Sequence, residues 1–124
     1  MQKNLAKQLW HLYQQTYFVL EETLPEVHEL AIITAFNPLG SLRKASYNNK
    51  MQEQLKAQLI RSNIEFSRLD GCSMDCTHKE PSLAVATSQE QGVSLGKAYQ
   101  QNAIFYLKGD ELWLVLWECP QLRF

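Results

Sequence analysis

Residues 30–35 form an unbroken apolar run, Leu-Ala-Ile-Ile-Thr-Ala, in which half of the side chains are β-branched. Pro25 precedes this run, and the turn signal Asn37-Pro38 follows it. A short continuous run of this composition is typical of a strand that is covered on both faces of a sheet. We therefore predict a central strand here, around which the other elements must be placed.

A helix is predicted after the turn at residues 37–40. Its apolar stripe recurs at helical spacing and consists of Met51, Leu55 and Leu59. Ser46 or Asn49 can cap the helix, because short polar side chains accept hydrogen bonds from the free amides of a first turn. Asn63 is expected to end it, since asparagine tolerates the left-handed conformation that follows many helices.

Two short strands are predicted next, over residues 64–69 and 82–87. The first meets the turn signal Asp70-Gly71, and the connection between the strands is a polar loop that carries Cys72 and Cys76. These strands would follow each other directly, with no helix between them.

A second helix is expected to begin at Ser88, because Gln91 stands three residues later in the spacing of a capping box. Asn102 can close this helix. Residues 103–107 and 111–117 are both strand-like and flank a connection that contains a glycine, so they predict a hairpin.

The N-terminal region adds an amphipathic helix over residues 5–16, and residues 16–20 have the composition of a strand. The order is then an N-terminal helix followed by β-α-β-β-α-β-β. This order predicts an α+β fold with a split βαβ, ferredoxin-like sheet and helices mainly on one face. A fold of this kind hosts many unrelated activities, so it predicts no function by itself.

Composition narrows the class of protein. A chain of 124 residues with 45% hydrophobic and 20% charged residues is expected to fold as one domain, residues 1–124. Its 12 Lys and Arg are scattered among 13 Asp and Glu, so no basic stripe favours nucleic acid as a partner.

Location is predicted from what the sequence does not contain. Its longest apolar runs are far shorter than the roughly 20 residues that cross a bilayer, and the N-terminus lacks the apolar stretch of a secretory signal. Three cysteines, an odd number, fit reduced thiols. We expect a cytoplasmic protein without a membrane partner.

Chain direction groups the polar residues. If each element crosses the full height of the sheet, one pole collects seven polar side chains: Asn37, Ser46, Asn49, Glu80, Ser82, Gln101 and Asn102. Strand ends and helix starts are common ligand sites in sheets with helices. The first hypothesis is a non-catalytic binding or regulatory module that takes a small polar ligand or a protein partner at this pole. The structural alternative is that these residues cap helices and shape turns.

Two chemical alternatives remain open. Glu80 is the only carboxylate in the polar set and could act as a general acid or base in an enzyme. Cys72, Cys76 and His78 have C-x₃-C-x-H spacing and could bind a metal or form a redox pair. No fourth ligand lies nearby, and Cys119 could supply one only if the last strand passes this loop, so no cofactor is predicted.

The tryptophans offer a last surface hypothesis. Trp10, Trp113 and Trp117 could mark a partner surface, including that of a homodimer, because aromatic residues are enriched at interfaces. They could equally pack the N-terminal helix over the hairpin.

Four motifs occur in order along the chain: Ile33-Thr-Ala-Phe-Asn-Pro38, Ser46 with Asn49, Glu80-Pro-Ser82 and Gln101-Asn-Ala103. Together they resemble domain-of-unknown-function family 3293, a family of small bacterial proteins, over nearly the whole chain. The resemblance implies a bacterial, soluble, stand-alone domain. It implies no activity, cofactor or catalytic residue, and the loop with Cys72 is not part of the pattern.

Overall fold

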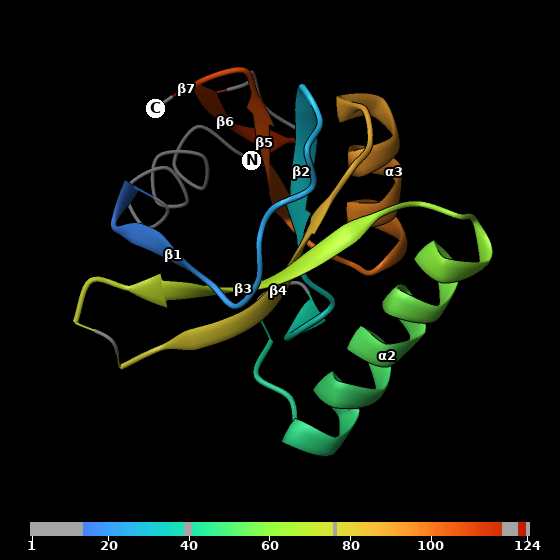
Figure 1. Ribbon diagram of the computed structural model, residues 1–124. Helices are drawn as coiled ribbons and strands as arrows, with labels where there is room; N and C mark the ends of the chain where they lie inside the picture. Colours follow the sequence, from blue (N-terminus) through green and yellow to red (C-terminus); the bar gives the residue numbers. More distant parts are fainter. Residues whose placement is uncertain (1–13, 39–40, 76, 118–121, 124) are drawn as a thin grey trace.

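The computed structural model describes residues 14–38, 41–75, 77–117 and 122–123. Its elements in chain order are β1 (Thr16–Leu20), β2 (Glu29–Ile33), α2 (Ala45–Arg61), β3 (Phe66–Ser73), β4 (Lys79–Val85), α3 (Gln89–Ala98), β5 (Ala103–Lys108), β6 (Glu111–Leu116) and β7 (Leu122–Arg123). The strands form one sheet in the order β1-β3-β4-β2-β5-β6-β7, and the paired neighbours are antiparallel. Figure 1 shows this sheet as strongly twisted, with α2 and α3 beside it.

The mixed α+β class is confirmed, and so is the central strand, because β2 occupies the middle of the sheet. Residues 16–20, which have strand composition, form β1. The predicted N-terminal helix falls on residues 1–13 for most of its length and so lies outside the described residues. Neither α2 nor α3 is both long and apolar enough to span a bilayer.

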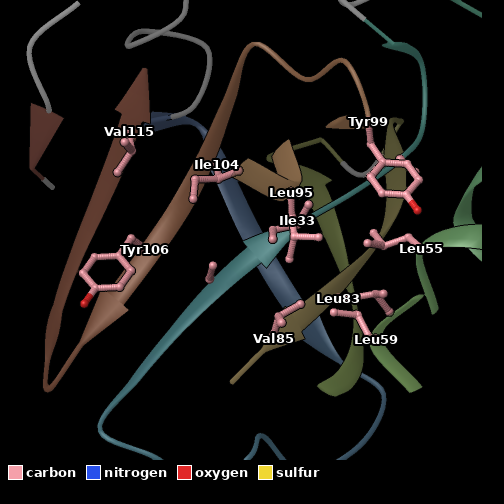
Figure 2. Packing of buried hydrophobic residues seen from close by; sticks show 12 residues of the cluster. Ile33, Leu55, Leu59, Leu83, Val85, Leu95, Tyr99, Ile104, Tyr106 and Val115 are labelled. Atoms are coloured by element: carbon pink, nitrogen blue, oxygen red, sulfur yellow. The ribbon is translucent and has the colours of Figure 1, made fainter. Parts of the chain in front are cut away.

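One face of the sheet packs against both helices. Ala31 and Ile33 of β2 contribute to this core together with Leu55 and Leu59 of α2 and with Leu95 of α3. Figure 2 shows the side chains from the two helices directed toward those of the strands. Leu55 and Leu59 are fully buried, which confirms the helical stripe predicted from the sequence.

The other face of the sheet has a second apolar cluster. It takes the alternate residues of β2, Leu30 and Ile32, and Leu24 of the β1–β2 connection packs against it. Phe18, which packs against this cluster, meets Phe105 edge to face, with ring centroids 5.0 Å apart. Since β2 contributes to both clusters, its unbroken apolar sequence is explained by burial on both sides.

The turn predicted at Asp70-Gly71 is wrong. β3 continues through both residues to Ser73, with β1 paired along one edge and β4 along the other. Gly71 lies opposite Phe18 and Glu80, and a Cβ at this position would be in ordinary contact with the Phe18 ring. Pairing on both edges satisfies the backbone hydrogen bonds of this segment, which outweighs the local turn preference.

The predicted caps of α2 are wrong at one end and confirmed at the other. The N-cap is Lys44, whose side chain makes no capping hydrogen bond, and Ser46 and Asn49 lie inside the helix. At the C-terminus, Asn63 adopts a left-handed φ of 56°. The amides of Asn63 and Ile64 donate to the carbonyls of Ile60 and Leu59, as in a Schellman motif.

The predicted start of α3 is confirmed, whereas its end is not. Ser88 is the N-cap, and its hydroxyl accepts a hydrogen bond from the Gln91 amide at 3.2 Å. The helix is closed by Gln100, which has a left-handed φ of 57°, and not by Asn102. The Gln100 and Gln101 amides donate to carbonyls of the last turn, so the chain has already left the helix before Asn102.

Candidate functional site

The β2–α2 connection begins with a tight turn. After β2 ends, the Thr34 hydroxyl donates to the Pro81 carbonyl at 2.8 Å and accepts from the Phe36 amide at 3.1 Å. Asn37 follows with a left-handed φ of 47°. Asparagine is among the few residues other than glycine that adopt this region readily, which explains its use at this turn.

Asn37 is held by Asn48 on the first turns of α2. The Asn37 amide donates to Asn48 Oδ1, and Asn48 Nδ2 donates to Asn37 Oδ1, both at 2.9 Å. The Arg43 amide also donates to Asn37 Oδ1, at 3.0 Å. This reciprocal pair fixes both ends of the β2–α2 connection against the start of the helix.

One turn further along α2, Gln52 continues the same pattern. Its Oε1 accepts from the Ala35 amide at 2.8 Å, and its Nε2 donates to the Pro81 carbonyl at 3.1 Å. The side chain is buried. Gln52 therefore satisfies a backbone donor and a backbone acceptor that have left the β2–β4 ladder.

Gln101 reaches the same connection from the other side. Its Nε2 donates to the carbonyls of Phe36 and Tyr99, both at 3.1 Å. The backbone carbonyl of Gln101 accepts a hydrogen bond from the Trp117 indole at 2.9 Å. We refer to the side chains of Asn37, Asn48, Gln52 and Gln101 as the amide network, which joins β2, α2, β4 and the α3–β5 connection.

Glu80 lies at the edge of this network. Its carboxylate accepts a side-chain hydrogen bond from Asn37, and the Ser82 hydroxyl donates to its backbone carbonyl at 3.1 Å. Burial disfavours the charged form and raises the pKa of Glu80 above its ordinary value, and the hydrogen bond from Asn37 opposes this only in part. The carboxyl group is the titratable member of an otherwise neutral cluster.

The structure brings four of the seven predicted polar residues together, namely Asn37, Glu80, Ser82 and Gln101. Ser46 and Asn49 are exposed on α2, and Asn102 is half-buried between Gln101 and β5. Sequence reasoning missed Asn48 and Gln52, which are both buried. Their spacing ahead of Leu55 and Leu59 extends the buried stripe of the helix, and this was the available signal.

A small hollow of about 80 Å³ lies against the amide network. Its walls include Ala35, Pro38, Tyr47, Met51, Tyr99 and Gln100. The Ala35 amide donates to Gln52 and the Tyr99 carbonyl accepts from Gln101. Pro38 and Gln100 are chain neighbours of Asn37 and Gln101. The network therefore shapes this hollow, although its volume is far below the roughly 300–1,000 Å³ typical of sites for small molecules.

Beside the hollow is an exposed patch that is apolar and cationic. Leu42 is 90% exposed and Tyr47 is 40% exposed, and the Arg43 guanidinium lies 5.5 Å from the centre of the Tyr47 ring. Lys44 is the N-cap, and the first turn of α2 contains no acidic residue. We refer to Leu42, Arg43, Lys44, Tyr47 and Lys50 as the basic surface.

The structure describes two of the three predicted metal or redox ligands. Cys72 is a buried free thiol within β3, His78 is exposed, and Cys76 lies outside the described residues. In the part of the chain that the structure describes, no group of three His, Cys, Asp or Glu side chains could hold a metal.

Asp75 explains the polarity of the same loop. It accepts hydrogen bonds from the Ser73 hydroxyl at 2.7 Å and from the Thr77 amide and hydroxyl at 3.1 and 2.8 Å. These bonds, with Ser73 first, lower the pKa of Asp75 to about 2. The polar residues of this loop therefore form a hydrogen-bonded turn.

Comparison with known proteins identifies a family. A search of curated proteins and a search of solved structures each returned no match. A family model described as "Protein of unknown function (DUF3293)" matches residues 33–104. This span is more than half of the chain, and it contains the whole amide network and Glu80. The chain belongs to this family of proteins of unknown function, DUF3293.

Proposed function

We propose that the chain is a non-catalytic protein-binding module, and that its binding site is the basic surface together with the adjoining hollow. This proposal rests on the hydrogen bonds that the amide network makes. Its side chains bond to one another and to the backbone of the connection that leads into the basic surface. The network therefore positions a binding surface and leaves few of its own groups for a ligand.

The size of the hollow favours a side chain as its occupant. A volume of about 80 Å³ accommodates a few aliphatic carbons, whereas a metabolite would need several times more space. Apolar groups of Pro38, Tyr47 and Met51 line it. Burial of an aliphatic side chain here would contribute roughly 1–2 kcal/mol to binding.

The charge of the surface favours an acidic partner. Arg43, Lys44 and Lys50 are exposed, and residues 36–52 contain no Asp or Glu. An acidic segment would be attracted to these cations and to the N-terminal end of α2, where the helix dipole is positive. The partner we propose is a segment of a protein in which glutamates flank a small aliphatic side chain.

A titration with a defined probe tests this function. A fluorescently labelled, terminally blocked peptide of alternating glutamate and valine residues should bind with an affinity that falls as salt is raised. The peptide with lysine in place of glutamate is the matched control and should not bind. The Tyr47→Ser variant should bind the acidic peptide several-fold more weakly. Equal binding of the two peptides, or binding of neither, would contradict the proposal.

An enzyme that uses Glu80 as acid or base is the second candidate, and one observation favours it. Burial raises the pKa of Glu80, as is common for catalytic carboxyls. The walls of the hollow, however, do not include Glu80. The Glu80→Gln variant separates the candidates, because it should leave peptide binding unchanged and would abolish any acid–base activity.

The wider setting of the module is also proposed. The order β3-β4-β2-β5, in which β4 lies between β2 and β3, supports a split βαβ, ferredoxin-like core. The buried free thiol of Cys72 supports a reducing, cytoplasmic location. The resemblance of the sequence motifs to a family of small bacterial proteins supports a bacterial source. Over the whole chain, 12 Lys and Arg are balanced by 13 Asp and Glu, and this balance supports a protein partner in preference to nucleic acid.

A further inference from the structure

The chain carries a segment whose chemistry is the opposite of the basic surface. Residues 19–28 comprise the last two residues of β1 and the connection to β2, and they contain Glu21, Glu22 and Glu26 but no lysine or arginine. Arg68 binds Glu22 at 3.0 Å and so offsets one of the three charges. Glu21 and Glu26 are exposed. We refer to residues 19–28 as the acidic segment.

Exposed apolar side chains are concentrated in the same two regions. Among the described residues, seven large hydrophobic side chains are exposed: Val19, Leu20, Val27, Leu42, Tyr47, Ile60 and Met74. Three of them lie in the acidic segment and two in the basic surface. An exposed apolar side chain flanked by charges of one sign is a common arrangement at protein interfaces. The two regions therefore complement each other, because both expose apolar side chains and their charges are opposite.

The two regions lie on different elements of the molecule. The acidic segment begins on β1, where the strand register sets Leu20 level with Leu69 of β3 and Ser82 of β4, so that β3 and β4 separate it from β2. The segment then leads into the start of β2 at Glu29, whereas the basic surface follows the end of β2 at Ile33 and continues into α2. One molecule therefore presents its two complementary surfaces on separate elements, and a second molecule can use both.

We propose that the basic surface binds the acidic segment of a second copy of this chain, so that copies associate head to tail. This inference rests on the proposed function and names its partner. Such a contact is heterologous: it forms a ring where the rotation between copies closes and an open chain where it does not. The aliphatic side chains of the acidic segment supply the apolar group for the hollow, and the glutamates face Arg43 and Lys44.

Sedimentation velocity over a range of protein and salt concentrations tests the contact. The wild-type chain should associate at high concentration and dissociate as sodium chloride is raised. Arg43→Glu/Lys44→Glu and Glu21→Lys/Glu26→Lys should each weaken self-association by on the order of tenfold or more, because like charges then meet in the contact. Each variant is checked for folding by its thermal transition. Glutamate at the start of α2 suits the helix dipole, so the first variant should remain folded.

Mixing the two charge-reversed variants in equal amounts should restore association, because each then meets an opposite charge on the other. Lys79→Glu/Lys108→Glu, which changes the net charge equally at exposed strand positions outside both regions, should leave association unchanged. A wild-type chain that stays monomeric at the highest concentrations, or a mixture that stays monomeric, overturns the inference.

The same samples separate this inference from the proposed function. If the glutamate–valine peptide binds the basic surface while the wild-type chain stays monomeric, the module binds a different protein and only the head-to-tail contact is wrong. If association occurs but is unaffected by Arg43→Glu/Lys44→Glu, the contact lies elsewhere and the inference is again wrong. If the wild-type chain neither binds the peptide nor associates, both proposals are wrong.

Discussion

The two helices on one face of the sheet are held there in different ways. α3 approaches β2 and β5 closely, because Gly92 and Gly96 present no side chain to Ala31 and Ile104 of these strands. α2 carries amide side chains instead, and Asn48 and Gln52 reach the β2–α2 connection and β4. A third amide, Gln58, accepts a hydrogen bond from the Tyr99 hydroxyl at 2.8 Å.

The α3 region is therefore held by close packing, whereas the α2 region is held by hydrogen bonds. Close contact of apolar atoms gives α3 little freedom to change, since interiors transmit even one added methyl group as strain. In the α2 region, hydrogen bonds hold the irregular β2–α2 connection in place. Because a hydrogen bond depends on the angle between donor and acceptor, these bonds fix the orientation of the groups as well as the space that they fill. The proposed binding surface lies on the α2 region.

The largest effect is expected where α3 is packed most tightly. A Cβ at Gly96 would lie 2.7 Å from Trp117 Cη2 and 2.8 Å from Ile104 Cγ2. Gly96→Ala should destabilise the fold by about 2–3 kcal/mol, although alanine is intrinsically the better helix former by about 1 kcal/mol. Urea unfolding measures this. Ser94→Ala, on the exposed side of the same helix, should not destabilise, and a stabilised Gly96→Ala protein would show that the close packing is wrong.

A somewhat smaller effect is expected from removing one amide of α2. Gln52→Leu keeps the volume but leaves the Ala35 amide without its acceptor, which should cost about 1–3 kcal/mol. Hydrogen exchange at the Ala35 amide should accelerate together with the loss of stability. Gln54→Leu, an exposed change on the same helix, is the control. Unchanged exchange at Ala35 in Gln52→Leu would mean that the amide network does not hold this connection.

A still smaller, pH-dependent effect is expected at Glu80. Its folded-state pKa is raised above the ordinary 4.5, so its protonated form favours folding. This contribution is fully present below pH 4.5 and is lost as the pH rises through the folded-state value. Glu80→Gln, which resembles the neutral acid, should therefore be more stable than wild type at neutral pH and equal to it in acid. Unfolding free energies of both proteins against pH would show the opposite trend if the ionised carboxylate were the stabilising form.

The smallest effect is expected at Gln100, which adopts φ 57° at the end of α3. Glycine enters this region without steric cost, so Gln100→Gly should stabilise the protein by about 0.5–1 kcal/mol. Asn63→Gly, at the matching position after α2, should give less, because asparagine already tolerates this conformation. A larger gain at Asn63 than at Gln100, measured by thermal unfolding, would contradict this ranking.

Regular elements could be predicted from the sequence because their signals are local. The apolar run of β2, the stripe of Leu55 and Leu59, and the cap at Ser88 each follow from spacing and propensity. The run through Asp70-Gly71 was misread, since the pairing of β3 with two neighbouring strands is not visible locally. Chain direction predicted the polar pole, but Asn48 and Gln52 were missed, because a polar residue on a buried stripe is explained only by the distant backbone groups it serves.

Nuclear magnetic resonance of the side-chain amide groups tests the central claim most directly, because asparagine and glutamine NH₂ signals can be followed during a titration with the glutamate–valine peptide. We expect the largest shifts at the backbone amides of residues 42–47, and only small shifts at the side-chain amides of Asn37, Asn48, Gln52 and Gln101. Largest shifts at the Asn37 and Gln101 side chains would show that the network itself contacts the ligand, which would contradict its role as a scaffold.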